Sequence, residues 1–218
     1  MDAVGERLAE VRSRIGTDVT VVAVTKGFGP EAVRIALDAG LADVGENYAQ
    51  ELLAKAAAVD AAVGDAAAGD AAVGGVRWHF LGHVQGNKVK SLAPVVAVWQ
   101  GVDGVATAEA IRARRPDAAL FVQVNLSGLA QRNGCSWEDA PAVVESAPGV
   151  RGLMGVAGPG DPRPQFRRLA ALARELGLPE VSMGMSGDYA VAVEEGSTMV
   201  RLGTVLFGPR PERGDLRR

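Results

Sequence analysis

Short apolar runs alternate with longer stretches of helical spacing along the whole chain. Continuous β-branched and apolar runs predict strands that are buried on both faces, as in a parallel sheet. Helical stretches lie between these runs, and residues 30–40, for example, open on proline and close on glycine, as helices prefer. We predict strands at residues 19–24, 42–45, 77–82, 96–102, 119–125, 150–156, 180–185 and 198–203.

Strand followed by helix, repeated eight times, predicts an α/β fold of the (β/α)8 TIM-barrel type. A doubly wound open sheet is the competing architecture, but such a sheet usually has a glycine-rich nucleotide turn after its first strand. Here that turn reads TKGFGP at residues 25–30, with neither a GxGxxG nor a Walker pattern. The barrel is therefore favoured.

Three segments lie outside the strand–helix repeat, within what we predict to be a single domain of residues 1–218. The first 16 residues place apolar side chains at helical spacing and predict an additional amphipathic N-terminal helix, with no apolar run typical of a signal peptide. Residues 54–75 are almost entirely Ala, Val, Asp and Gly; their first turns can extend the preceding helix, and the later Gly-Asp punctuation predicts a low-complexity loop. Residues 209–218 are predicted to form a flexible tail.

Composition narrows the class of protein. Of the 218 residues, 48% are hydrophobic, which is enough for a sizeable core. The net charge of −3 gives no electrostatic footprint for nucleic acid. No segment reaches the roughly 18 apolar residues that a membrane span needs. A single cysteine, Cys135, excludes an internal disulfide and fits a reducing compartment, so we expect a cytoplasmic protein.

Polar residues collect just past the predicted strand ends, which share one face of a barrel, where function resides. The positions are Lys26, Glu46, Asn47, His83, Asp103, Asn125, Ser186, Arg201, Gly203 and Thr204. Some have ordinary explanations: Asn47 suits a helix N-cap, and Lys26 could extend its ammonium to water. Arg201 is harder to explain, because it interrupts an apolar strand and a buried guanidinium needs a partner.

Two glycine- and hydroxyl-bearing segments follow the seventh and eighth strands. They read MGMSGD at residues 183–188 and RLGTVLFG at 201–208. In barrels of this type these two loops commonly bind phosphate through backbone N–H groups and a helix N-terminus. Ser186 and Thr204 add hydroxyls, while Gly203 lets the backbone approach a ligand closely. Phosphate binding is therefore favoured over two unrelated turns.

Other chemistries fit less well. GMSGD resembles the GxSxG nucleophile elbow, but Asp188 replaces the last glycine and both histidines precede Ser186 in the chain. His79 and His83 have HxxxH spacing, but on a strand that runs into a glycine turn, where they would not share a helical face to bind zinc. Cys135 is better explained as a small loop residue than as a nucleophile.

A lysine, a phosphate-binding loop pair and a buried arginine on one barrel face point to pyridoxal 5′-phosphate. Lys26 would form the Schiff base and Arg201 would face the pyridine nitrogen. Arginine stays protonated, so it can only donate to that nitrogen, which disfavours a pyridinium and weakens the ring as an electron sink. A phosphosugar enzyme, in which Lys26 attacks a carbonyl, remains an alternative.

Seven motifs between Val19 and Gly208 together resemble the pyridoxal phosphate homeostasis proteins. They are VVAVTK, VGENYAQEL, WHFLGHVQGNKVK, VQVN, GLMGVA, SMGMSGD and MVRLGTVLFG. Two segments depart from the family pattern: TKGFGP replaces the commoner SKTKP-like turn, and residues 54–75 are longer and plainer than usual. The resemblance implies a single-domain barrel like the N-terminal domain of alanine racemase, with no established turnover.

The resemblance also implies roles for individual residues. Lys26 is then the Schiff-base lysine and Arg201 the partner of the pyridine nitrogen. The remaining cofactor-binding residues by this resemblance are Ser186, Gly203 and Thr204 for the phosphate, Asn47 and Met183 near the cofactor, and His83 in the segment matching GHxQxNK.

An amino-acid racemase is the main alternative to a carrier. Racemisation needs a base on each face of the substrate, and alanine racemase takes its second base, a tyrosine, from an added β-domain. This chain ends soon after the last strand, and its tyrosines are Tyr48 and Tyr189. We therefore expect a monomeric carrier or buffer in intracellular pyridoxal phosphate homeostasis, without turnover, nucleic acid or membrane. Apo forms of pyridoxal phosphate enzymes are the candidate protein partners.

Overall fold

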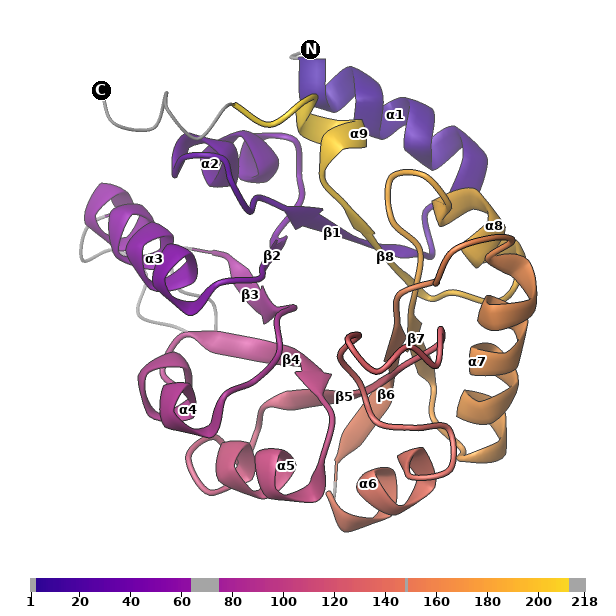
Figure 1. Ribbon diagram of the computed structural model, residues 1–218. Helices are drawn as coiled ribbons and strands as arrows, with labels where there is room; N and C mark the ends of the chain where they lie inside the picture. Colours follow the sequence, from indigo (N-terminus) through magenta and orange to yellow (C-terminus); the bar gives the residue numbers. More distant parts are fainter. Residues whose placement is uncertain (1–2, 64–74, 148, 212–218) are drawn as a thin grey trace.

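The computed structural model is a closed barrel of eight parallel strands in the order β1 to β8 (Figure 1). It describes residues 3–63, 75–147 and 149–211. The strands are β1 (Thr20–Val24), β2 (Asp43–Glu46), β3 (Arg77–Phe80), β4 (Val96–Val102), β5 (Ala119–Val124), β6 (Val150–Gly155), β7 (Glu180–Ser182) and β8 (Met199–Leu202). The barrel closes where β8 pairs with β1, in a register that sets Val22 opposite Arg201. The predicted barrel is confirmed, and each predicted strand overlaps an observed one.

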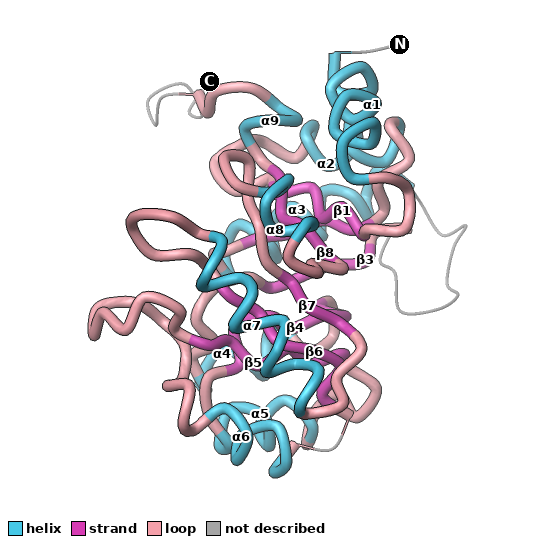
Figure 2. The backbone as a smooth tube through the Cα atoms, turned by 90° about the vertical axis from the view of Figure 1, so that its right-hand side faces the viewer, coloured by secondary structure: helices cyan, strands magenta, loops and turns pink. Residues whose placement is uncertain are grey.

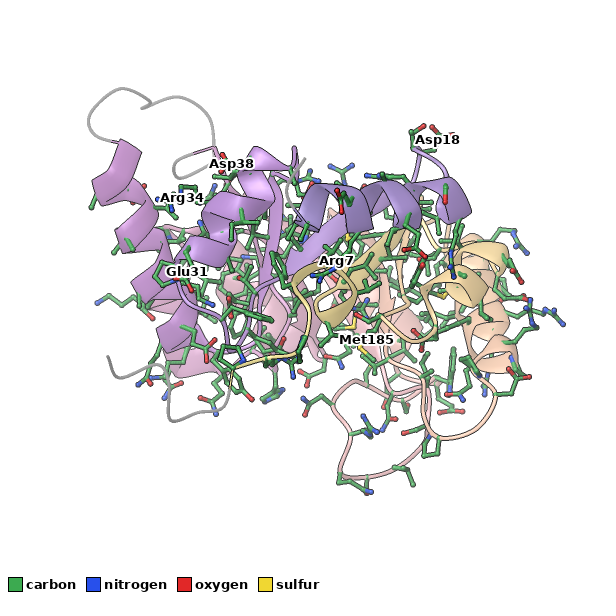
Figure 3. The ribbon with its side chains drawn as sticks, turned by 90° about the horizontal axis from the view of Figure 1, so that it is seen from above. Arg7, Asp18, Glu31, Arg34, Asp38 and Met185 are labelled. Carbon is green, nitrogen blue, oxygen red and sulfur yellow. The ribbon has the colours of Figure 1, made fainter. Side chains whose placement is uncertain are left out.

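Helices surround the barrel on the outside (Figure 1). They are α1 (Ala3–Ile15), α2 (Glu31–Asp38), α3 (Ala49–Val63), α4 (Gly86–Leu92), α5 (Val105–Arg112), α6 (Ala140–Ser146), α7 (Arg163–Glu175), α8 (Tyr189–Glu194) and α9 (Thr204–Phe207). The additional N-terminal helix is α1, which packs against α9. Arg7 of α1 lies between these two helices and donates to the carbonyl oxygen of Leu206 at 2.9 Å (Figure 3).

Two segments predicted to be irregular are only partly described. The low-complexity segment 54–75 begins inside α3, which continues to Val63, while residues 64–74 lie outside the described residues. Of the tail predicted at 209–218, residues 209–211 are described and 212–218 are not.

The strands bury side chains on both faces, as their continuous apolar runs predict. On β4, Trp99 points outward into the layer between strands and helices, whereas Val98 points into the barrel. Val98 packs there in a small interior cluster with Val22, Phe121, Met154 and Met199. Polar residues share this interior: His79, Gln100, Ser182 and Arg201 are all buried. The barrel interior therefore contains both a small apolar cluster and a group of buried polar side chains.

The two ends of the barrel differ in their connections. Asp18 and Asp38, which precede β1 and β2, lie at one end, and Met185, which follows β7, lies toward the other (Figure 3). Long loops project from that second end in the side view (Figure 2). The segment between β5 and α6 lies over it (Figure 1). No helix in the described ranges is both long and apolar enough to cross a membrane.

Candidate functional site

A cavity of about 550 Å³ opens at the end of the barrel where the strands finish. Barrel geometry places the residues that follow different strands around this one opening. Predicted site residues that line it are Lys26, Asn47, Ser186, Arg201, Gly203 and Thr204. The structure thus brings together six of the eight residues singled out from the sequence.

The other two, His83 and Met183, lie elsewhere. His83 Nδ1 is 2.9 Å from a carboxylate oxygen of Asp103, and its half-exposed ring lines a neighbouring cavity that shares Asn47 with the first. Met183 is fully buried in the layer between strands and helices. The chain turns at Gly184, whose φ is +93°, and it is Met185, one residue past that turn, that reaches the main cavity.

Lys26 lies two residues past the end of β1 and is half-buried at the cavity wall. Its backbone is held in place, because the next N–H group, that of Gly27, donates to the Glu51 carboxylate at 3.0 Å. Burial lowers the pKa of Lys26, and the positive charges of Arg210 and Arg201 lower it further, against an opposing effect of Glu46. Near neutral pH a larger fraction of the Lys26 amine is therefore unprotonated and nucleophilic than for a lysine exposed to water.

Arg201 is 5% exposed and points from β8 into the interior at the base of the cavity. Its guanidinium donates to Ser182 Oγ and to the carbonyl oxygen of Gly155, each at 2.7 Å. It forms no ion pair with any residue that the structure describes. Burial lowers the pKa of Arg201 to about 10, which still leaves it protonated at neutral pH. The cavity thus has a fixed positive charge whose protein partners are neutral.

The loops after β7 and β8 are joined through a hydroxyl group. Ser186 Oγ accepts from the backbone N–H groups of Gly203 at 3.4 Å and Val205 at 3.3 Å. A side chain at Gly203 would place its Cβ 3.3 Å from the carbonyl oxygen of Val24, which is a tight contact. Backbone, hydroxyl groups and glycine therefore meet on one side of the cavity, where an anion can approach the main chain.

Sequence reasoning missed two arginines of the cavity. Arg132 lies in the segment between β5 and α6, which Asn125 folds by donating to the carbonyl oxygen of Leu129 at 2.9 Å. Arg210 lies in the segment predicted to be a flexible tail, yet its side chain lines the cavity. With Lys26 and Arg201 they make four cations, and none of the described residues that line the cavity is acidic. The described lining therefore suits an anion.

A buried ion pair behind β1 and β2 was also missed. Lys55 Nζ lies 2.5 Å from Glu46 Oε1 and donates to the carbonyl oxygen of Thr25 at 2.7 Å. The Thr25 hydroxyl donates to the same Glu46 oxygen at 2.6 Å. Burial raises the pKa of Glu46, an effect that the Lys55 ammonium opposes. Lys55 is therefore engaged in a buried ion pair, although it contacts the residue next to Lys26 in the chain.

The cysteine and the two tyrosines do not line the main cavity. Cys135 is buried, its thiol donates to the carbonyl oxygen of Gln123 at 3.3 Å, and burial raises its pKa to about 11. Tyr189 is buried in the layer between strands and helices, and Tyr48 lines the neighbouring cavity instead. Within the described ranges, no three His, Cys, Asp or Glu side chains gather where they could hold a metal ion.

Comparison with known proteins places this geometry in context. The family model for the alanine racemase N-terminal domain matches residues 1–211. The pyridoxal phosphate homeostasis protein of Pseudomonas aeruginosa is 37% identical, over 96% of this chain and 97% of that protein. The protein of the same name from Aquifex aeolicus is 34% identical, over 94% of each.

Solved structures agree. PipY of Synechococcus elongatus with PLP bound has a TM-score of 0.79 and 31% sequence identity, and the match covers 94% of this chain and 100% of that one. Alanine racemase from Corynebacterium glutamicum has a TM-score of 0.71 at 16% identity, and the match covers 98% of this chain and 62% of that one. This second likeness is one of fold alone.

Proposed function

The chain belongs to the alanine racemase N-terminal domain family and, within it, to the pyridoxal phosphate homeostasis proteins. On that premise we propose that the cavity at the end of the barrel binds pyridoxal 5′-phosphate, stores it and releases it. The observation that carries this proposal is Arg201, a buried cation with neutral protein partners beside a half-buried lysine and a hydroxyl-bearing loop pair. The protein thus binds pyridoxal phosphate and acts in its homeostasis.

The residues present fit the cofactor. Its phosphate carries nearly two negative charges at neutral pH and accepts several hydrogen bonds, which suits a cavity whose described lining has four cations and no acid. Ser186, Gly203 and Thr204 would hold the phosphate. Arg201 would donate to the pyridine nitrogen and keep it unprotonated. The cofactor itself supplies an aldehyde carbon that an amine can attack.

Lys26 is the amine that we propose for this covalent bond. Its lowered pKa favours attack on the aldehyde carbon, and the aldehyde oxygen leaves as water. Lys55 is excluded from this role by its ion pair with Glu46. His83 and Met183, which the family resemblance placed near the cofactor, would act from outside the cavity lining.

We propose that turnover is negligible. Racemisation needs a base on each face of the substrate, and neither tyrosine of the chain lines the cavity. An arginine at the pyridine nitrogen also weakens the ring as an electron sink. The curated relatives are named as homeostasis proteins rather than as enzymes, which supports a carrier.

Peptide mapping tests the proposal. Protein loaded with pyridoxal phosphate should be yellow, and borohydride reduction should fix the pyridoxyl group on Lys26. A label on Lys55, Lys88 or Lys90 instead would overturn the assignment. A colourless protein that takes up no pyridoxal phosphate would overturn the function and favour a phosphosugar enzyme.

Lys26→Ala separates the covalent bond from the binding site. The phosphate contacts do not depend on Lys26, so the variant should lose the yellow band and keep measurable affinity for pyridoxal phosphate in equilibrium dialysis. The parent should prefer pyridoxal phosphate over pyridoxal, which lacks the phosphate. Equal affinity for the two ligands would place the phosphate elsewhere.

Apo forms of pyridoxal phosphate enzymes are the partners that we propose for release. A loaded monomer should reactivate a purified apo-transaminase at least as fast as free pyridoxal phosphate at equal concentration. Light scattering on the same sample tests the monomeric state. No reactivation over hours would contradict release to such enzymes.

A further inference from the structure

A chain of hydrogen bonds leads from Arg201 away from the cavity through the inside of the barrel. We call it the interior relay, and its members are Ser182, Gln100, His79 and Asp43. Arg201 donates to Ser182 Oγ at 2.7 Å, and the Ser182 hydroxyl lies 2.6 Å from Gln100 Oε1. Gln100 Nε2 lies 2.8 Å from His79 Nδ1, and His79 Nε2 lies 2.7 Å from an Asp43 carboxylate oxygen.

The relay spans the barrel from one end to the other. Arg201 lines the cavity at the mouth, whereas Asp43 and Arg77 are the first residues of β2 and β3, at the opposite end. Arg77 Nε is 2.5 Å from the same Asp43 oxygen that faces His79. Ser182, Gln100 and His79 are all 0% exposed, so no water competes for their hydrogen bonds.

Donor and acceptor roles along the relay follow from its first bond. Arg201 can only donate, so Ser182 accepts from it and gives its own proton to Gln100 Oε1. The Gln100 amide nitrogen must then donate to His79 Nδ1, which therefore has no proton. The remaining imidazole proton lies on Nε2 and faces the Asp43 carboxylate. Every hydrogen bond thus points from the guanidinium toward the carboxylate.

Electrostatics agree with this assignment. Burial lowers the pKa of His79 against the opposing effect of Asp43, which favours the neutral imidazole that the relay requires. Hydrogen bonds from His79 and Arg77 hold the pKa of Asp43 below its usual value in spite of burial, so its carboxylate is charged. A cation at one end and an anion at the other are joined by three neutral, polarised groups.

We propose that the interior relay is a positioning device for Arg201, which fixes the orientation of its guanidinium at the pyridine nitrogen of the cofactor. Ser182 holds one edge of the guanidinium in place, and the alignment of the relay toward Asp43 stabilises the positive charge without putting an acid in the cavity. The proposal rests on the proposed function. Gln100 and His79 act through Arg201 and do not touch the cofactor.

The relay can be tested first without cofactor, by nitrogen-15 NMR of the imidazoles. The chain has two histidines, and half-exposed His83 serves as the internal reference. In the parent, His79 should show an unprotonated Nδ1 and a protonated Nε2. Gln100→Glu keeps the side-chain shape but sets a carboxylate oxygen against Nδ1, so His79 should gain a second proton. A parent His79 with its proton on Nδ1 would overturn the relay.

The positioning role is tested with cofactor bound. Ser182→Ala and Gln100→Met should each shift the absorption maximum of bound pyridoxal phosphate and weaken its binding about fivefold, the worth of roughly one hydrogen bond. Ile111→Ala is the matched control, because Ile111 is a fully buried residue of α5 on the outside of the barrel. It should lower the thermal midpoint and leave spectrum and affinity unchanged.

Double variants show whether the relay acts through Arg201. In an Arg201→Met background, Gln100→Met should cause no further spectral change, since the group that it positions is gone. If Ser182→Ala and Gln100→Met only lower the thermal midpoint, as Ile111→Ala does, the relay supports the fold alone and the proposal is wrong. A parent that binds no pyridoxal phosphate would instead overturn the proposed function, and the positioning role with it, while the imidazole spectra still decide the direction of the relay.

Discussion

Lys55 and Arg201 are two cations buried to nearly the same degree, with 4% and 5% of their surface exposed. Lys55 lies behind the barrel wall against the Glu46 carboxylate, at 2.5 Å. Arg201 lies inside the barrel and donates to a hydroxyl and a carbonyl oxygen. The first charge is neutralised by the fold. The second has neutral neighbours, so its field acts on whatever occupies the cavity.

Burial without a counter-ion is costly, and a protein retains such a group only where something offsets the cost. For Arg201 the two short hydrogen bonds and the interior relay supply part of the offset, and we propose that an anionic ligand supplies the rest. For Lys55 the Glu46 carboxylate offsets the cost of burying the charge, and no ligand is needed. The comparison therefore sets a structural cation, Lys55, against the cation that we propose binds a ligand, Arg201, and four substitutions test that distinction.

The largest effect is expected for Lys55→Met. The variant leaves the Glu46 carboxyl buried without its partner, so the free energy of unfolding should fall by about 3–5 kcal/mol in urea titrations. The double variant Lys55→Met/Glu46→Gln removes the second charge as well and should regain a good part of that loss. A single variant as stable as the parent would show that the pair contributes nothing to the fold.

Gly203→Asp introduces a carboxylate into the lining of the cavity that contains Arg201. The new carboxylate repels the phosphate, and its Cβ meets the carbonyl oxygen of Val24 at 3.3 Å. The dissociation constant for pyridoxal phosphate, measured by equilibrium dialysis, should rise more than about tenfold. Gly203→Asn has the same shape without the charge and should lose less affinity. Parent-like retention by Gly203→Asp would place the phosphate outside these loops.

Arg201→Met should cost far less stability than Lys55→Met. It removes two hydrogen bonds, but it also removes a buried charge that forms no ion pair with the residues that the structure describes. We expect the free energy of unfolding of the cofactor-free protein to change by at most about 1 kcal/mol. The comparison would fail if the two variants were equally unstable in urea.

The smallest effect is expected for Arg210→Met, which tests a neighbour of Lys26, the lysine that we propose forms the Schiff base. Arg210 helps to lower the pKa of Lys26, so its removal should raise that pKa. At a fixed pH below that value less Lys26 amine is then free, and the yellow band should form about two- to threefold more slowly. The pH profile of the rate should move to higher pH. Arg174→Met on the exposed face of α7 should leave the profile where it is.

The barrel fold and the position of several site residues could be predicted, because a parallel barrel has a recognisable pattern of apolar runs in its sequence. Strands buried on both faces are continuous apolar runs, and β1 and β4 appear as such. Strand ends share one face, so the sequence predicts that a lysine after β1 and glycines after β7 and β8 meet there. Arg201 stood out because a charge interrupts an apolar strand.

The rest depends on geometry that no local pattern encodes. Arg132 and Arg210 lie in segments without periodicity, whose path over the cavity is set by tertiary contacts such as those of Asn125. Lys55 belongs to an alanine-rich helix whose composition does not indicate which of its side chains are buried. Gln100 is a single polar residue in an apolar strand, and its role emerges only when the barrel register brings it beside His79.

The burial of Cys135 affects whether its thiol can react with an aldehyde ligand. Aldehydes add to thiols as well as to amines, and Asn133, two residues before this cysteine, lines the cavity. With a pKa of about 11, only roughly one thiol in ten thousand is ionised at neutral pH. The side chain is also 8% exposed and tied to a main-chain carbonyl. The lone thiol of the chain is thus poorly reactive close to the cavity in which we propose that an aldehyde binds, so side reactions between the two are disfavoured.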